Sequence, residues 1–260
     1  MRSGRGWFTL HPERLSEMSS RIVSVAGRSR TGATRPFLCE AADGQRFFVK
    51  GGNAGWTELV TEYVVSRLAQ EYGLPVAPLS LLEIPAELAL HAVVEGAHEF
   101  QPGVVFGSRG VPFGEDLRSG HLSGIPDDEK IRLLCFDWWV RNGDRSLDIL
   151  GGDPGILWDP TMNAMTVIDF DRALDGDFDE VEFLRTHPFR DVLPFIEAGK
   201  LTRLRTSFES ALYSLDKIWE ELPSEWLVDP AGDARVDMSY RSVETTLIKP
   251  DLPVDGFLPG

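Results

Sequence analysis

The chain has 260 residues, of which 42% are hydrophobic and 10% aromatic. This composition excludes a chain that is disordered throughout, because enough apolar surface is available to offset the entropy of folding. Its 41 Asp and Glu outnumber its 26 Lys and Arg, and the resulting net charge of -15 argues against nucleic acid as a partner.

The cysteines and the hydropathy bear on location. Cys39 and Cys135 lie far apart and have no Cys or His at metal-ligand spacing, so neither a disulfide framework nor a zinc site is expected. The N-terminal sequence MRSGRGWFTLHPERL lacks the apolar run of a secretory signal. No stretch approaches the roughly 18 apolar residues of a membrane span. We therefore expect a cytoplasmic protein without a membrane partner.

The first half of the chain begins with predicted strands. Residues 21–50 contain short apolar runs (RIVSVAG, PFLCEA and RFFVKGG) separated by small residues and by the turn Asp43-Gly44. This pattern predicts strands joined by hairpins, with Lys50 at the end of the third strand. Residues 56–72 then have apolar side chains at helical spacing, and the Gly and Pro that follow predict where this helix ends.

The middle of the chain continues with a second predicted strand pair, at residues 76–84 and 88–96. The Gly-rich residues 102–124 show little periodicity, so we expect an irregular connection that contains the boundary between two lobes. Residues 127–141 have an acidic start and a dense apolar face, which predicts a largely buried helix.

The last part of the chain is predicted to be mostly helical around one hairpin. The hairpin joins residues 155–159 to residues 165–170, the chain becomes helical from Val181 onward, and residues 201–221 are amphipathic. Strands with one helix, followed by mostly helices, is an α+β order and not the alternation of a doubly wound sheet.

Lys50 and Glu62 are the first candidate pair. Lys50 ends an apolar strand, from which its ammonium could reach the phosphates of a ligand. Glu62 turns toward the preceding sheet if Leu59 and Tyr63 pack there, so it could hold Lys50, and Glu58 is a competing partner. The alternative for each residue is an ordinary solvated position.

Residues 26–34 (AGRSRTGAT) join two predicted strands with small and hydroxyl-bearing residues, which would let backbone N–H groups approach a phosphate. The segment matches neither a Walker A loop nor a protein-kinase Gly-rich loop. Ser29, Thr31 and Thr34 are therefore candidate phosphate contacts, and a plain flexible hairpin tip fits the segment equally well.

Two aspartates are the strongest candidates for chemistry. Asp144 lies in NGDRSLD directly after the predicted buried helix, and Asp169 ends the apolar run VIDF. One carboxylate could orient or deprotonate an attacking hydroxyl while the other ligates Mg²⁺. Taken singly, each could be a turn or cap residue. Arg145 could brace the loop by pairing with a carboxylate, or could lie on the surface.

The remaining acidic residues and the histidines are assigned no chemistry. An acidic run follows Asp169, and we expect most of it to be solvated: Asp171, Asp175, Asp177 and Asp179. The five histidines, His187 among them, form no ligand spacing.

In this order, the lysine strand, glutamate helix, Asp-Arg loop and strand-end Asp resemble the HipA-like kinases, distant relatives of the protein and phosphoinositide kinases. The resemblance covers residues 22–227 and rests on FFVKGG, TEYVVSRLAQEYGLPVAP, DWWVRNGDRS, ILWDP, VIDFDRAL, HPF and LPSEWL. It implies a two-lobed protein-kinase-like fold, with a β-rich N-lobe in residues 1–100 and a mainly helical C-lobe in residues 101–260. It also implies ATP and Mg²⁺ as cofactors.

The resemblance assigns a role to four residues. It implies that Lys50 contacts the nucleotide phosphates and that Glu62 positions Lys50. It further implies that Asp144 is the catalytic base and that Asp169 ligates Mg²⁺. The family usually has an Asn about five residues after the catalytic Asp as a second metal ligand, where this chain has Ile149.

Two aspartates could replace the missing Asn. Asp148 is adjacent to the position, and Asp153 takes it if SLDI and GG are a local insertion that aligns DPGILW with the family's Asn-Pro-Asn-Leu-Leu segment. A carboxylate can serve as this ligand, and we prefer Asp153.

The function that the resemblance implies is transfer of the γ-phosphoryl group of ATP to a Ser or Thr hydroxyl of a protein. A phosphoinositide or small-molecule hydroxyl would use the same residues. A catalytically inactive nucleotide-binding or interaction module is the main alternative, because the Asn is missing, and transfer of AMP is a further one.

Overall fold

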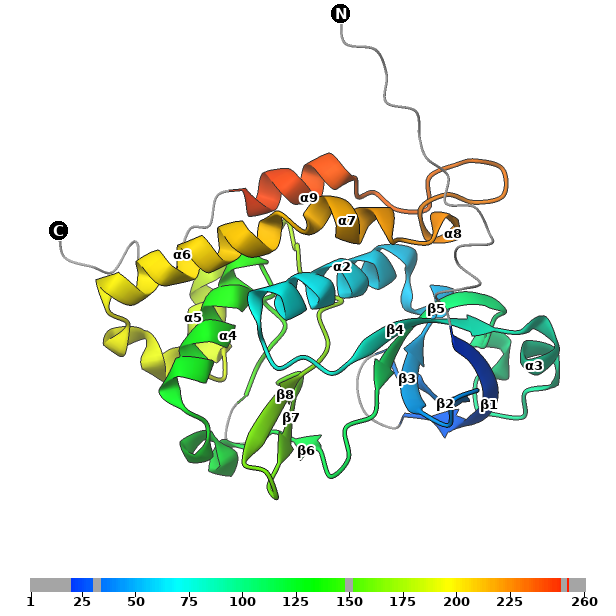
Figure 1. Ribbon diagram of the computed structural model, residues 1–260, viewed down its shortest axis with the longest axis horizontal. Helices are drawn as coiled ribbons and strands as arrows, with labels where there is room; N and C mark the ends of the chain where they lie inside the picture. The colour runs from blue at the N-terminus through cyan, green and yellow to red at the C-terminus, as the bar shows by residue number, and fades with distance from the viewer. Residues whose placement is uncertain (1–19, 30–33, 148–151, 249–251, 253–260) are drawn as a thin grey trace, which may run out of the picture.

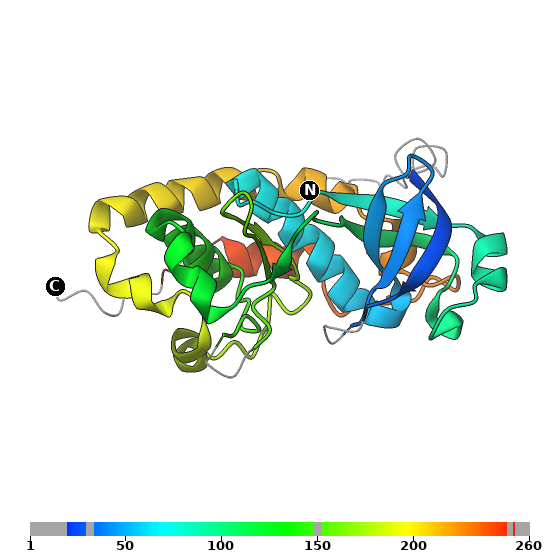
Figure 2. The same ribbon diagram turned by 90° about the horizontal axis from the view of Figure 1, so that it is seen from below.

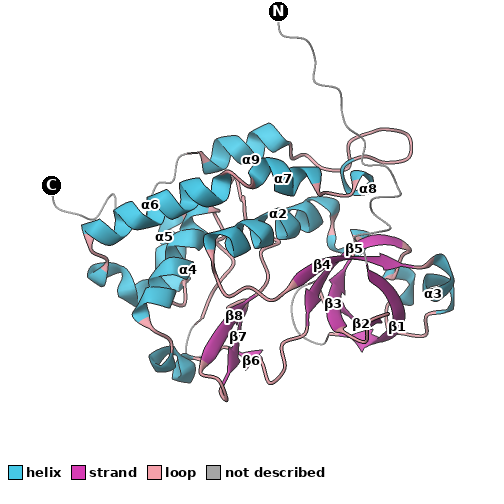
Figure 3. Ribbon diagram, viewed as in Figure 1, coloured by secondary structure: helices cyan, strands magenta, loops and turns pink. Residues whose placement is uncertain are grey.

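The computed structural model describes residues 20–29, 34–147, 152–248 and 252. A closed five-stranded barrel lies at one end of the molecule and most of the helices lie at the other, with α2 running between them (Figures 1 and 3). A small three-stranded sheet in the order β6-β7-β8 makes up the rest of the strands described. The chain is therefore a mixed α and β protein, as the sequence predicted.

The barrel has the strand order β1-β2-β3-β5-β4 and encloses its own apolar core. Side chains alternate along β2 and β3, so Phe37 and Cys39 point inward on β2, and Phe47 and Val49 point inward on β3. Lys50 comes next on β3 and points out of the barrel. The strands are β1 (Ser20–Arg28), β2 (Phe37–Ala41), β3 (Arg46–Lys50), β4 (Leu79–Ile84) and β5 (Gly103–Arg109).

The predicted partner strand for β4, at residues 88–96, is wrong. Those residues lie in the short helix α3 (Ala86–His91) and the loop after it, where Leu88, Ala89 and Ala92 pack on the barrel core at a helical spacing. The true partner is β5, which pairs with β4 along its length.

The Gly-rich residues 102–124 are accordingly not an irregular connection, because they contain β5, β6 (Glu115–Asp116) and a 3₁₀ helix, η3 (Ser119–Gly124). Strand pairing made this segment regular where its own sequence showed no period. The barrel thus extends beyond residue 100, where the predicted N-lobe ends.

Helix α2 (Trp56–Tyr72) begins and ends at the predicted residues. Gly73 ends it in the left-handed conformation, with φ of 83°, and its N–H bonds to the carbonyls of the last turn. Eleven of its 17 residues are buried. The outer face of the barrel packs on α2 through Leu81 and Phe106, and α6, α7 and α8 pack along α2 from above in the view of Figure 1. Figure 2 shows α2 (cyan) between the barrel and α6 (yellow).

The remaining elements pack around a second, larger core. Phe136 of α4 contacts Tyr72, Trp139 and Phe170, and Trp139 stacks on Phe208 of α6. No helix in the described residues is both long and apolar enough to cross a lipid bilayer. The elements are α4 (Asp127–Trp139), β7 (Ile156–Asp159), β8 (Ala164–Val167), α5 (Glu180–Thr186), α6 (Ala198–Leu212), α7 (Leu215–Glu220), α8 (Ser224–Leu227), α9 (Tyr240–Leu247), and the 3₁₀ helices η1 (Gly52–Ala54), η2 (Ala97–Glu99) and η4 (Arg190–Phe195).

An isolated bridge connects the β7–β8 hairpin to the chain that leaves α2. Val76 pairs with Val167 in parallel, the Val167 N–H donates to the Pro75 carbonyl at 2.8 Å, and the Ala77 N–H donates to the Val167 carbonyl at 3.2 Å. This bridge brings the end of β8 next to the barrel. It therefore fixes the position of Asp169, which lies two residues further on.

We expect Phe136→Ala to lower the free energy of unfolding by about 3–5 kcal/mol, because it leaves a cavity among three aromatic rings. Phe136 is fully buried, whereas Phe195 is 72% exposed, so Phe195→Ala is the matched control and should change stability by less than about 0.5 kcal/mol. Urea denaturation of both variants measures the difference. Equal losses would contradict the location of the core.

Candidate active site

Lys50 is the centre of a buried charge cluster. Its Nζ donates to Glu62 Oε2 at 2.9 Å, to Asp169 Oδ1 at 2.7 Å and to Asp171 Oδ2 at 3.0 Å. The Lys50 residue is 9% exposed and Glu62 is 3% exposed, so the pair lies away from bulk water. The ion pair that the sequence predicted between Lys50 and Glu62 is present, and Glu58 does not take its place.

Local structure explains why these groups converge. Lys50 points out of the barrel toward α2, and Glu62 lies on a buried turn of that helix. Asp169 and Asp171 flank Phe170, whose ring is fully buried in the larger core. Asp169 is in the left-handed region, with φ of 63°, and in this turn both carboxylates reach the same ammonium.

The charges in the cluster shift one another's protonation. Burial alone would lower the pKa of Lys50, but the three carboxylates outweigh it and hold the pKa well above the ordinary value. Burial raises the pKa of Glu62 to about 7 in spite of Lys50. Burial opposes ionisation of Asp169 as well, yet the Lys50 ammonium lowers its pKa. Burial raises the pKa of Asp171.

The acidic run is mostly solvated, as predicted, because Asp175, Asp177 and Asp179 are exposed, but Asp171 is an exception. Its residue is 8% exposed and it is ion-paired with Lys50. The sequence carried no strand signal for this contact, because Asp169 and Asp171 lie in a turn after β8, with Asp169 in the left-handed region.

Asp144 and Asp153 lie at the open side of the cluster. Both side chains are exposed, and the Asp153 carbonyl accepts the Ser146 N–H at 3.1 Å, which ties the two loops together. Partial enclosure, together with the negative charges of Asp169 and Asp144, raises the pKa of Asp153 even though its side chain reaches solvent. The carboxylate of Asp153 is therefore within the electrostatic reach of Asp169.

The oxygen donors fit a hard divalent cation. The side chain of Asp169 is 30% exposed, and the exposed carboxylate of Asp153 lies close enough to interact with its charge. Carboxylate oxygens with room for water are the ligands that Mg²⁺ prefers. Oxygens of Glu62, Asp169 and Asp171 also lie within 4.8 Å of one another, but the Lys50 ammonium is bonded to all three.

The β1–β2 loop lies at the end of the barrel where Lys50 ends β3, because Phe37 pairs with Val49. The Ser29 N–H donates to the Pro36 carbonyl at 2.8 Å. Thr34 is described and partly exposed, whereas Thr31 lies outside the described residues. Asp148, the alternative metal ligand, also lies outside them.

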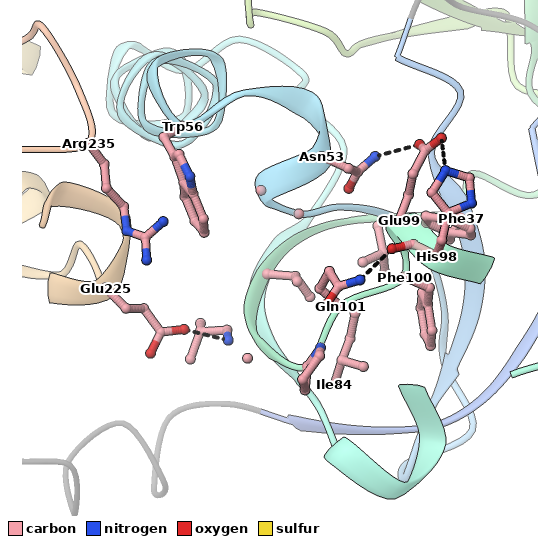
Figure 4. A pocket seen from close by; sticks show the side chains of 17 residues that line it. Phe37, Asn53, Trp56, Ile84, His98, Glu99, Phe100, Gln101, Glu225 and Arg235 are labelled. Carbon is pink, nitrogen blue, oxygen red and sulfur yellow. Dashed lines mark hydrogen bonds and ion pairs between the residues drawn. The ribbon is translucent and has the colours of Figure 1, made fainter. Parts of the chain in front are cut away.

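A cavity of about 590 Å³ opens at the mouth of the barrel (Figure 4). Phe37, Val49 and Ile84 line its barrel side, and Arg235 stacks over the Trp56 ring at 4.5 Å on the other. None of the carboxylates that bind Lys50 lines this cavity. It is therefore separate from the charge cluster, although both adjoin the end of β3.

Comparison with known proteins gives a family match. The profile of the HipA-like kinases matches residues 22–253. The comparison with curated proteins found no significant match. Among solved structures, the crystal structure of the proinflammatory kinase CtkA from Helicobacter pylori aligns over 89% of this chain and 91% of that chain, with 11% identity and a TM-score of 0.46. A likeness this distant carries no functional argument.

The raised pKa of Glu62 predicts a pH-dependent stability. Folding raises the pKa from 4.5 to about 7, so the folded protein keeps a proton that the unfolded chain releases between these values. The free energy of unfolding should therefore fall by about 1–3 kcal/mol as the pH rises through this window. In Glu62→Gln, denaturation by urea in EDTA should show a shallower fall.

The matched control is Glu58→Gln, one turn earlier on α2, which should keep the wild-type slope. Identical slopes in Glu62→Gln and wild type would show that Glu62 does not hold the proton.

Proposed function

Because the chain belongs to the HipA-like kinase family, we propose that it is an ATP- and Mg²⁺-dependent kinase that transfers the γ-phosphoryl group to a hydroxyl, namely a Ser or Thr hydroxyl of a protein. The observation that carries the proposal is the bonding of Lys50 to Glu62 and Asp169 at once, from a strand, a helix and a strand end. Phosphoryl transfer needs a held lysine beside a metal-binding carboxylate.

In the proposed complex, Lys50 binds phosphate oxygens while Glu62 keeps its ammonium in place. Asp169 and Asp153 would hold Mg²⁺, which when bound offsets the charge of the phosphates. The backbone of the β1–β2 loop, with Ser29, Thr31 and Thr34, would contact the same phosphates.

Asp144 is the proposed base. Its exposed carboxylate would accept the proton of the acceptor hydroxyl as that oxygen bonds to the γ-phosphorus. The bond from the γ-phosphorus to its bridging oxygen breaks, and ADP leaves with the electron pair. The remaining buried carboxylates of the cluster stay on Lys50 and take no proton from the substrate.

The proposal includes a two-lobed arrangement. The barrel and α2 would form the nucleotide-binding N-lobe, and the elements from β6 onward would form the C-lobe. Since β5 pairs with β3 and β4, we put the boundary after Arg109 and not at residue 100. We also propose that the protein is cytoplasmic and acts on a protein substrate, with neither nucleic acid nor membrane as a partner.

The second candidate is an inactive nucleotide-binding module, and the exposure of Asp153 is the observation that favours it. Ile149 stands in place of the family's Asn, so Asp153 is the candidate second metal ligand among the residues that the structure describes. If its carboxylate stays in solvent, the cation lacks a ligand and transfer fails.

Calorimetric titration of ATP in Mg²⁺ and then in chelator tests the nucleotide site. Wild type should bind ATP in a Mg²⁺-dependent way, and Lys50→Ala and Asp169→Asn should each weaken binding at least about tenfold through lost charge pairing. Asp144→Asn should keep the affinity and lower phosphoryl transfer about 10²–10⁴-fold, measured with radiolabelled ATP.

The control is Asp175→Asn, an exposed member of the acidic run, which should change neither quantity. Absence of ATP binding by the wild type would overturn the proposed function. Binding without transfer to any hydroxyl would leave the inactive module.

Asp153→Ala distinguishes the two candidates. If Asp153 ligates the cation, the Mg²⁺ concentration that gives half-maximal transfer should be about 10–100-fold higher in Asp153→Ala than in the wild type. In Asp153→Asn this concentration should lie between the values of the wild type and Asp153→Ala. Unchanged Mg²⁺ dependence in Asp153→Ala would exclude this residue as a ligand.

A further inference from the structure

A buried arginine next to Asp144 connects its own segment of the chain to two others. The Arg145 side chain is 2% exposed. Its Nη1 lies 2.9 Å from the Pro154 carbonyl oxygen, 2.6 Å from that of Gly155 and 2.9 Å from that of Ile168. Its Nη2 donates to the Asp169 carbonyl at 3.2 Å. Arg145 is thus no surface residue, and its guanidinium is enclosed by backbone carbonyls.

The three segments are those that carry the candidate catalytic and metal-binding acids. Arg145 itself follows Asp144, the carbonyls after Asp153 belong to the second segment, and Asp169 is in the third. A guanidinium presents five N–H donors in a rigid plane, so it fixes the partners around it more closely than an ammonium can. One side chain therefore sets the spacing of all three acids.

The buried Asp137 holds Arg145 and is itself held by the buried His187 and Asn142. Asp137 Oδ2 accepts from Arg145 Nε at 2.8 Å and lies 3.2 Å from His187 Nε2, while Oδ1 accepts from Asn142 Nδ2 at 3.0 Å. His187 Nδ1 accepts the Phe189 N–H at 3.1 Å, so a neutral His187 carries its proton on Nε2 and donates it to Asp137. Burial lowers the pKa of His187, which favours this neutral form.

Gly155 gives independent support for the tight fit. It is left-handed, with φ of 54°, and an added Cβ would lie 2.2 Å from Arg145 Nη1 and 2.9 Å from the Ile168 carbonyl oxygen. A side chain at this position would push the guanidinium away. The chain therefore has no room for any residue but glycine where Arg145 crosses between the segments.

We propose that Arg145, oriented by Asp137 and His187, is a positioning residue that fixes the distances among the three acids and hence the cation site between them. The metal part of this inference rests on the proposed function, whereas the tether itself does not. Loss of the guanidinium should let the three segments move apart while the barrel and helices stay folded.

The first experiment is hydrogen exchange followed by NMR on Arg145→Lys. The Ser146 N–H bonds to the Asp153 carbonyl and the Ile168 N–H to the Gly155 carbonyl, so these two amides report on contact between the segments. We expect both to exchange at least about tenfold faster relative to core amides. Arg67→Lys is the matched control, because Arg67 is also ion-paired, with Glu221, and its side chain is only 18% exposed, away from these segments.

The second experiment measures the cation. In Arg145→Lys the Mn²⁺ concentration that half-saturates the ATP complex should rise about 10–100-fold, and ATP binding without metal should not change. Arg67→Lys should leave both values as in wild type. Excess Mn²⁺ should restore transfer by Arg145→Lys, which a loss of folded protein would not allow.

If Arg145→Lys does not fold, Gly155→Ala displaces the same guanidinium without removing its charge. Gly44→Ala is its control, since Gly44 is also left-handed, with φ of 78°, but an added Cβ there meets nothing within 4 Å. Gly155→Ala should accelerate exchange at Ser146 and Ile168, and Gly44→Ala should not.

The two proposals can fail separately. Equal exchange at Ser146 and Ile168 in the variants and their controls would overturn the positioning role, whatever the protein does with ATP. If exchange is faster in Arg145→Lys and the wild-type protein binds no ATP, the positioning role is supported and only the proposed function is overturned.

Discussion

The structure depends on satisfying one buried ammonium. Lys50 ends a barrel strand and turns its charge away from water, which is tolerated only because carboxylates from α2 and from the segment after β8 surround it. Three carboxylates around one cation leave an excess of negative charge. Burial first, and then this excess of negative charge, raises the pKa of Glu62, so the cluster gains from any additional cation at its open side.

Asp169 is held by two different cations at its two ends. Lys50 binds its carboxylate, and Arg145 binds its carbonyl oxygen. The residue is also in the left-handed region, where a non-glycine residue needs its surroundings to keep it. Such a constrained aspartate cannot turn to meet a ligand, so a ligand has to fit the direction in which the carboxylate already points.

The sequence predicted the elements of the fold that have a clear local sequence pattern. Helix α2 has both apolar residues at helical spacing and a glycine after its last residue, and its observed bounds are the predicted ones. β5 has no such signal, since its regularity comes from pairing with β3 and β4, strands far away in the sequence.

The candidate site divides in the same way. Lys50 and Glu62 could be paired because each sits on a strongly patterned element. Asp171 and His187 were assigned no chemistry, because their importance depends on what packs against them: Lys50 for the one and the fully buried Asp137 for the other. Long-range contacts of this kind leave no local pattern, and a reading of short motifs therefore passes over them.

The enclosure of α2 determines how this site can be controlled. Helix α2 has buried residues on most sides and packs on the barrel and on α6, α7 and α8, so it cannot swing outward without exposing much of the larger apolar core. Glu62 therefore stays beside Lys50 whether or not a ligand is present. Rotation of α2 therefore cannot switch the candidate site on or off. Control of the site has to work through the loops at the open side of the cluster or through the supply of ligand.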